Sequence, residues 1–165
     1  MDKTTSKIIV AIGMPGSGKT TLLKPLAEKH GWSYVNRDDI RAELFNNASV
    51  QDHKDLVWRE AEQRVRNALA QSAPVIYDAT FAEVAKRRAF VAELREMGWE
   101  RIIGFYVDTA PEIAKDRNRA RDRVVPESEL DTHFVIPLQK NPPDLSDGFD
   151  ELYTLETMDG LIAQL

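Results

Sequence analysis

The sequence predicts an α/β fold in three layers, in which a mainly parallel sheet of about five strands carries helices on both faces and an arginine-rich lid. Short apolar runs rich in β-branched residues alternate with longer segments of helical periodicity, which is typical of parallel sheets with helical crossovers. A glycine-rich segment follows the first run, and four arginines gather late in the chain. With 165 residues, we expect one domain, residues 1–165.

The glycine-rich segment at 13–21, GMPGSGKTT, matches the pattern GxxxxGK[ST] of a phosphate-binding P-loop. An apolar strand is expected before it at 7–12 and a helix from Lys19 to His30, the context that the motif requires. The alternative is a glycine-rich turn with a stray lysine. The P-loop interpretation predicts that backbone N–H groups and Lys19 bind the phosphates of a nucleoside triphosphate, while the Thr20 hydroxyl binds Mg²⁺. The predicted nucleotide-binding residues here are Gly13, Pro15, Gly16, Ser17, Gly18, Lys19, Thr20 and Thr21.

A second strand is expected at 32–35, after a helix end at Gly31, and a charged cluster, NRDDIR, follows it at 36–41. Ligands of parallel α/β sheets bind at the carboxyl ends of the strands, so this cluster is expected to face the nucleotide. If a helix begins at Asp38 or Asp39, Asp38 and Arg41 share one face. The alternative is a helix cap with a surface ion pair.

The middle of the chain predicts a covering helix at 50–71, a second helix at 82–97 and a strand at 101–107. Trp58 falls on the apolar face of the first helix, and we expect it in the core rather than as a platform for base stacking. The run 86–88, Lys-Arg-Arg, is expected on a solvated face, with anion binding as the alternative.

Another strand is expected at 73–80, and it brings Asp78 to the same edge of the sheet. A carboxylate at the end of an apolar strand can contact Mg²⁺ through water or orient a substrate in a P-loop enzyme. The alternative is a cap of the following helix.

The sequence from Thr109 to Glu112 has the spacing of a capping box with a proline in the first turn, which predicts a helix start. Arginines then stand at 117, 119, 121 and 123. We interpret residues 116–126 as a lid that closes guanidinium groups over the γ-phosphate, with Arg117 and Arg121 on one face. The alternative is a solvated helix balanced by acidic neighbours.

Residues 127–138 predict a further helix, and the alternating segment 148–155 predicts a strand that turns at Asp159 and Gly160 into a terminal hairpin, residues 149–165. The three histidines lack motif partners and are expected to be surface or packing residues.

Composition narrows the function classes. The formal net charge of −5 argues against a general binder of duplex DNA. The absence of cysteine excludes disulfide and thiolate chemistry and agrees with a reducing cytoplasm. The polar amino-terminus MDKTTSK and the short apolar run after it predict neither an export signal nor a membrane span.

The order GMPGSGKT, NRDDIR, VIYDAT and RNRARDRVVP, within residues 8–155, resembles the kinase domain of phage and bacterial polynucleotide 5'-hydroxyl kinases. The resemblance implies a P-loop NTPase-type kinase that uses Mg²⁺ and transfers the γ-phosphate of ATP to a 5'-OH end of RNA or DNA. It also implies a location in the cytoplasm, including the cytoplasm of phage-infected bacteria. It makes Asp38 the general base and Arg41 the ligand of the neighbouring acceptor phosphate. The other residues that it implicates are Lys19 and Thr20 on the nucleotide and metal, Asp78 and Thr80 on the acceptor side, and Arg117, Arg121 and Arg123 of the lid.

Two departures from the family pattern leave other functions open. Phe81 stands where family members often have asparagine, and no phosphatase or ligase domain accompanies the kinase unit, so we expect the chain to act alone or with separate partners of those kinds. One alternative is a kinase of a small-molecule hydroxyl, such as a nucleoside, sugar nucleotide or antibiotic. Another is a nucleotide-dependent switch, although no NKxD pattern is present to support a GTPase.

Overall fold

The structure is a computed structural model that describes residues 5–165. Residues 1–4, part of the segment used above to predict the absence of an export signal, lie outside this range. The strands are β1 (Lys7–Ile12), β2 (Ser33–Asn36), β3 (Val75–Asp78), β4 (Arg101–Tyr106) and β5 (Glu151–Thr154). The longer helices are α1 (Lys19–His30), α2 (Arg37–Phe45), α3 (Lys54–Ala70), α4 (Val84–Met97) and α5 (Pro111–Arg119). The shorter ones are α6 (Glu127–Leu130), the π-helix η1 (Asp131–Val135), α7 (Ile136–Lys140), the 3-10 turn η2 (Leu145–Asp147) and α8 (Met158–Ile162).

The strands form one sheet in the order β2-β3-β1-β4-β5, and all four pairings are parallel. The central strand β1 is buried on both faces, which explains its continuous apolar run. Asp78 lies in register with Asn36 of β2 and with Ala11 of β1. The carboxyl end of β3 therefore lies between the start of the P-loop and the start of α2.

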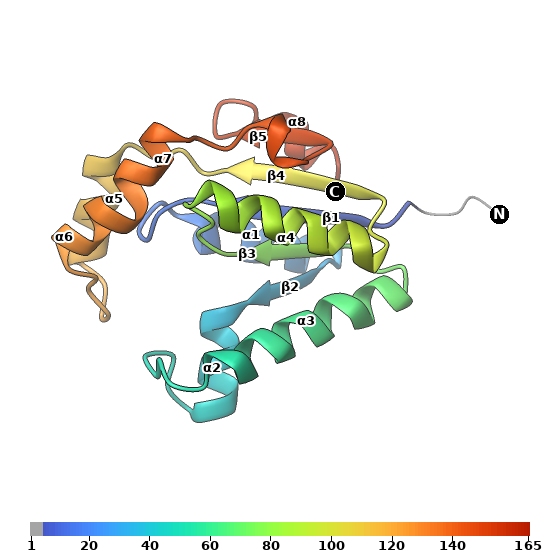
Figure 1. Cartoon of the computed structure of the whole chain (residues 1–165), viewed down its shortest axis with the longest axis horizontal. Coiled ribbons are helices and arrows are strands. Elements are labelled where there is room, and N and C mark those ends of the chain that lie inside the picture. The colour runs from blue at the N-terminus through green and yellow to red at the C-terminus, as the bar shows by residue number, and fades with distance from the viewer. Residues whose placement is uncertain (1–4) are drawn as a thin grey trace.

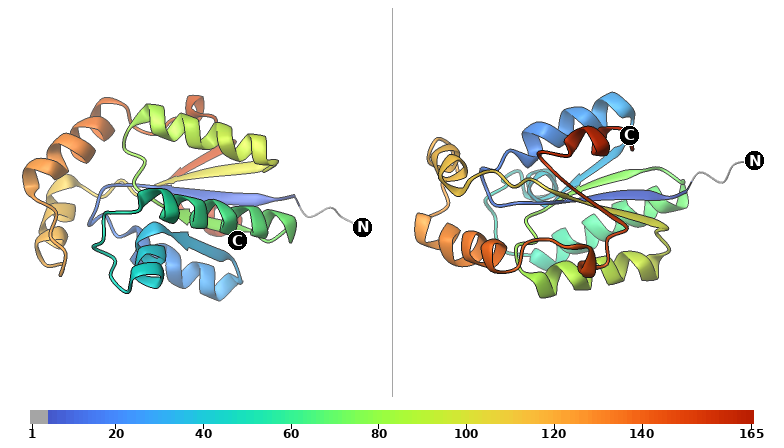
Figure 2. Two further views of the ribbon diagram at one scale, coloured as in Figure 1. Left: turned by 60° about the horizontal axis from the view of Figure 1, so that its bottom comes forward. Right: turned by 90° about the horizontal axis from the view of Figure 1, so that it is seen from above.

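Helices cover the sheet on both sides, as Figures 1 and 2 show. α1 and α8 lie on one face, and their apolar residues join a core cluster with Ile9, Ile76 and Ile103. α3 and α4 lie on the other face and share the larger cluster with Val10 and Tyr77. α5, α6 and α7 gather beyond the tips of the strand arrows (Figure 1). The predicted three-layer α/β fold is thus confirmed.

The predicted terminal hairpin is wrong. β5 pairs in parallel with β4, and the chain then enters α8 instead of a returning strand. The Thr157 hydroxyl accepts a hydrogen bond from the Thr154 N–H at 2.8 Å, which turns the chain towards the helix. Gly160 belongs to α8 and packs so closely on the Tyr153 ring that a Cβ would lie 2.7 Å from a ring carbon.

Two helix starts differ from those predicted. The cap of α2 is Asn36, whose side chain accepts hydrogen bonds from the N–H groups of Asp38 and Asp39, so the helix begins at Arg37. Thr109 does not cap α5, because its hydroxyl donates to the Ser17 carbonyl at 2.6 Å. This contact ties the start of α5 to the P-loop.

The expected helices at 50–71 and 127–138 are also modified. α3 begins only at Lys54, and the second segment divides into α6, η1 and α7, with Pro137 in the first turn of α7. Within residues 5–165, no helix is both long and apolar enough to cross a bilayer.

Arg87 was expected on a solvated face, but its side chain is buried to 1% exposure. Its Nε donates to an Asp147 carboxylate oxygen at 2.7 Å, and its Nη1 donates to the carbonyls of Phe81 and Ala82 at 2.9 and 3.2 Å. Its third group, Nη2, donates to the Asn141 carbonyl at 3.0 Å. Arg87 therefore joins the turn after β3 to the loop before β5. Helical periodicity alone could not predict this burial, because the partner Asp147 lies far away in the sequence.

Candidate active site

A cleft of about 1000 Å³ lies at the carboxyl edge of the sheet. Its walls come from the P-loop, the start of α2, the turn after β3 and the segment after α5. The predicted site residues that line it are Pro15, Gly16, Gly18, Lys19, Thr20, Thr21, Asp38, Arg41, Asp78, Thr80, Arg117, Arg121 and Arg123. Gly13 and Ser17 belong to the same loop but do not line the cleft, and Ser17 is buried. Segments far apart in the chain thus meet around one space.

The P-loop adopts a conformation that needs glycine at two points. Gly16 has a φ of +82°, and a Cβ there would lie 2.3 Å from the Ala114 carbonyl oxygen of α5. Gly18 has a φ of +97°, and a Cβ would lie 3.2 Å from the guanidinium of Arg117. The glycines therefore let α5 and its arginine approach the loop closely.

Lys19 is buried at the base of the cleft. Its ammonium donates to the carbonyls of Gly13 and Met14 at 2.7 and 3.1 Å. The pKa of Lys19 is lowered to about 8, mainly by burial; the negative charge of Asp78 opposes this shift and the positive charge of Arg121 adds to it. An anion arriving in the cleft would restore the stability of the charged form.

Asp78 is buried and accepts hydrogen bonds from two hydroxyl groups. Thr20 Oγ1 donates at 2.9 Å, and the Tyr34 hydroxyl donates to the same oxygen. Burial and the negative charge of Asp78 together raise the pKa of Tyr34. Sequence reasoning missed Tyr34, because only the pairing of β2 with β3 brings its hydroxyl to Asp78.

These oxygens suit Mg²⁺, a hard cation that takes one or two protein oxygens and completes its shell with water and phosphate. Thr20 offers a hydroxyl, and Asp78 offers a carboxylate behind it. Across residues 5–165, no cluster of three or more histidine and carboxylate side chains could hold a metal by itself. The site therefore fits a cation that arrives with a phosphate ligand.

Asp38 and Arg41 lie on one face of α2, as their spacing predicts. Arg41 Nη1 is 2.5 Å from Asp38 Oδ1, and the Asp38 side chain is about half exposed to the cleft. Arg123 Nη1 lies 3.8 Å from the same oxygen. Arg41 is mostly buried, and its Nε has no hydrogen-bond partner among the described residues. A buried donor without a partner is costly, so this position of the Arg41 side chain carries an energetic penalty.

The arginine-rich segment extends along the cleft from the P-loop to Asp38. Arg117 Nη1 donates to the Ser17 carbonyl at 3.2 Å, and Arg123 Nη1 donates to the Ala48 carbonyl at 3.3 Å. Asn118 is buried and exchanges hydrogen bonds with the backbone of Val125 at 2.8 and 3.1 Å, which closes the loop that carries Arg121. Arg119 does not line the cleft and pairs instead with Asp116 and Glu127. It is two residues from both Arg117 and Arg121, and on a helix such a spacing places a side chain on a different face.

Several residues of the cleft were not predicted from the sequence. Lys86 and His133 line it as well. Both are exposed, which agrees with the expected solvated face for Lys86 and surface position for His133. The alternative of anion binding is the only sequence signal that pointed to Lys86. The other unpredicted polar residues in the lining are Gln51, Lys54 and Glu129, whereas Asn36 and Arg37 belong to the cluster at 36–41 that was expected to face the nucleotide.

Comparison with known proteins agrees with this arrangement. A family described as AAA domain matches residues 8–133. A bifunctional polynucleotide phosphatase/kinase of Acanthamoeba polyphaga mimivirus is 24% identical over 115 residues, which are 70% of this chain and 24% of the viral protein. Adenylate kinase isoenzyme 1 of Homo sapiens is 29% identical over 123 residues, which are 68% of this chain and 62% of that enzyme. The chain thus spans less than two thirds of the length of either relative.

The crystal structure of a fungal RNA kinase has the same fold. It superimposes with a TM-score of 0.60 at 20% identity and covers 95% of this chain and 76% of its own. The family match extends from β1 past the arginine-rich segment. The chain therefore belongs to this AAA domain family as a P-loop kinase domain, and its resemblance to the polynucleotide 5'-kinase type is confirmed.

Proposed function

We propose that the chain transfers the γ-phosphate of ATP to the 5'-OH end of an RNA or DNA strand. The observation that carries the proposal is the contact of Asp38 with Arg41 at 2.5 Å in the cleft that Lys19 of the P-loop also lines. A carboxylate that accepts a proton and a guanidinium that binds a phosphodiester are the two groups that such an acceptor needs. The mimivirus relative and the fungal RNA kinase support this choice by their described activities.

In this proposal the P-loop N–H groups and Lys19 hold the β- and γ-phosphates. Thr20, and Asp78 through water, would hold Mg²⁺, which when bound would neutralise part of the negative charge of the phosphates. Asp38 orients the 5'-hydroxyl and accepts its proton at a carboxylate oxygen, while Arg41 binds the next phosphate of the strand with support from Asp78 and Thr80. Arg117, Arg121 and Arg123, which line the same cleft, would stabilise the charge that develops on the transferred group.

The pKa of Lys19 leads to a prediction for ATP binding. Because the free protein loses the Lys19 proton above about pH 8, whereas bound phosphates favour the charged ammonium, ATP binding must take up a proton there. We expect an affinity that is nearly constant from pH 7 to 8 and falls by up to about tenfold per pH unit above it. Isothermal titration calorimetry in buffers of different ionisation enthalpy measures both affinity and proton uptake. Lys19→Met should bind more weakly without this proton uptake, and an unchanged wild-type affinity up to pH 10 would contradict the assignment.

A small-molecule acceptor is the second candidate, and the 29% identity with adenylate kinase isoenzyme 1 favours it. A nucleotide-binding module without transfer is the third. Incubation with γ-labelled ATP and a panel of 5'-OH RNA, 5'-OH DNA, nucleosides, nucleotides and sugars separates them. We expect label at the 5' ends of oligonucleotides, with 5'-phosphorylated oligonucleotides as inactive controls. Label on small molecules alone would refute the proposal, and nucleotide binding without any transfer would favour the third candidate.

A further inference from the structure

A second pocket of about 600 Å³ opens from the side of the active-site cleft, between the start of α2, α3 and α4. The two spaces are direct neighbours, because Arg37, Thr80, Lys86, His133 and Phe134 line both of them. A ligand held in the cleft therefore lies beside this pocket.

The walls of the pocket are aromatic. Phe81 and Phe90 stack with ring centroids 4.7 Å apart, and the Trp58 ring meets Phe90 edge-on at 6.2 Å. Trp58 and Phe134 are only partly buried and come from opposite sides, from α3 and η1. The Arg37 guanidinium lies over the Trp58 ring, 5.4 Å from its centroid. Phe81 and Phe90 are themselves buried, so the partly exposed rings of Trp58 and Phe134 are the surfaces that a nucleobase can reach for stacking.

The backbone presents Phe81 to this pocket in an unusual conformation. Its φ is +42°, a value that bulky L residues rarely adopt. The Phe81 carbonyl is held by the buried Arg87 at 2.9 Å, so the surrounding structure maintains the turn. Such conformations gather at functional sites. The residue that departs from the polar pattern of the family is therefore part of a built aromatic wall.

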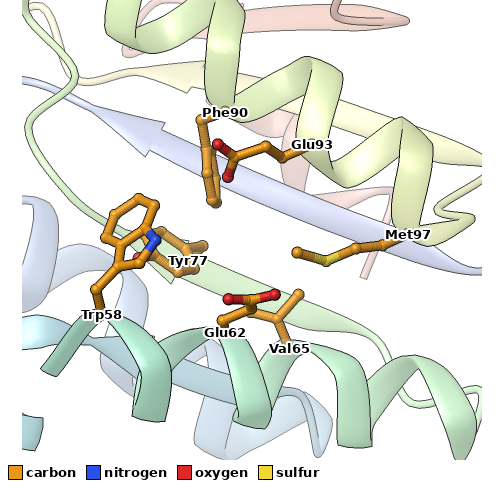
Figure 3. A pocket seen from close by; sticks show the side chains of 7 residues that line it. All are labelled: Trp58, Glu62, Val65, Tyr77, Phe90, Glu93 and Met97. Atoms are coloured by element: carbon orange, nitrogen blue, oxygen red, sulfur yellow. The ribbon is translucent and has the colours of Figure 1, made fainter. Parts of the chain in front are cut away.

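The pocket also has an acceptor group for hydrogen bonds. Glu93 of α4 lines it from an exposed position on the helix. Figure 3 shows Glu93 beside Phe90, with Trp58 and Tyr77 across the space between α3 and α4. A separate cavity of about 10 Å³, lined in part by the same Trp58, Phe90 and Glu93, has room for no more than one water molecule. Burial and the charges of Glu62 and Glu96 raise the pKa of Glu93.

We propose that this aromatic pocket, formed by Arg37, Trp58, Phe81, Phe134 and Glu93, binds one nucleobase of the acceptor strand near the end that is phosphorylated. The aromatic rings and the guanidinium would stack on the flat faces of the base, and Glu93 would accept a hydrogen bond from an N–H group on its edge. The inference rests on the proposed function, since it assigns a subsite of the same reaction. A sugar or an antibiotic hydroxyl alone offers no planar ring for these walls.

The test uses short 5'-OH oligonucleotides in which the first, second or third base is replaced in turn by an abasic site. At one of these positions we expect the loss of the base to raise KM by about 5- to 150-fold with kcat nearly unchanged, because stacking stabilises substrate and transition state alike. Trp58→Ala and Phe134→Ala should raise KM for the intact strand until it equals the KM for the abasic strand. Trp58→Phe keeps an aromatic ring and should retain most of the difference in KM between the intact and the abasic strand. Arg59→Ala, on the exposed side of the same helix, should leave both strands unaffected.

The outcomes separate the two proposals. If intact and abasic strands are phosphorylated with equal kcat/KM at all three positions, the pocket binds no base and this inference is overturned, while the kinase function stands. If no oligonucleotide is phosphorylated although ATP binds, the proposed function fails and the subsite fails with it. Because the comparison of substrates uses the wild-type protein, its result does not depend on the folding of any variant.

Discussion

Asp38→Asn is expected to lower kcat for phosphoryl transfer by about 10²- to 10⁴-fold and to leave ATP affinity within a few-fold of the wild type. Asparagine has nearly the same shape but cannot accept the proton of the attacking hydroxyl. It also removes the charge that pairs with Arg41 at 2.5 Å. The P-loop and Lys19 are untouched, so the nucleotide should still bind. Single-turnover transfer from labelled ATP, together with calorimetry of ATP binding, measures the two effects separately.

The neighbouring aspartate supplies a matched control. Asp39 lies on the same helix but pairs with Lys24 at 3.1 Å on the outside, with both side chains over 40% exposed. Exposed ion pairs contribute about 0–1 kcal/mol, so Asp39→Asn should keep turnover within a few-fold of the wild type. Wild-type turnover in Asp38→Asn, or an equal loss in both variants, would refute the role of Asp38 as the base.

Arg87→Met should reduce the free energy of unfolding by about 3–5 kcal/mol. Arg87 and Asp147 are both 1% exposed, and methionine would leave the carboxylate buried without its closest cation. The carbonyls of Phe81 and Asn141 would lose their donor as well. Urea unfolding followed by circular dichroism measures the difference in midpoint at constant slope.

Arg88→Met is the control for this prediction, because Arg88 contacts the same Asp147 at 3.0 Å from a side chain that is 56% exposed. Its loss should cost less than about 1 kcal/mol. Equal destabilisation by the two variants would mean that the buried ion pair does not have the role assigned to it. Since Arg87 also holds the turn at Phe81, its replacement should weaken the preference for a base in the aromatic pocket more than the replacement of Arg88 does.

Much of the fold could be predicted because its signals are local. The buried strand before Gly13, the loop that needs small residues and the helix end at Gly31 depend on the immediate neighbours of each residue. The spacing of three between Asp38 and Arg41 likewise implies a shared helix face. The terminal hairpin failed because a strand pattern does not indicate which neighbour the strand will pair with.

The sequence by itself determined a phosphate-binding loop, an acid–arginine pair at the end of the second strand and an arginine-rich segment, since each is a short pattern whose chemistry needs only adjacent residues. Only the tertiary structure decided that these meet around one cleft, that Tyr34 reaches Asp78 and that Arg87 is buried against Asp147. Those contacts join residues 44 and 60 positions apart, and they depend on sheet order and packing. The aromatic pocket belongs to the same class, because its walls come from α2, α3, α4 and η1 and exist only when these elements pack together.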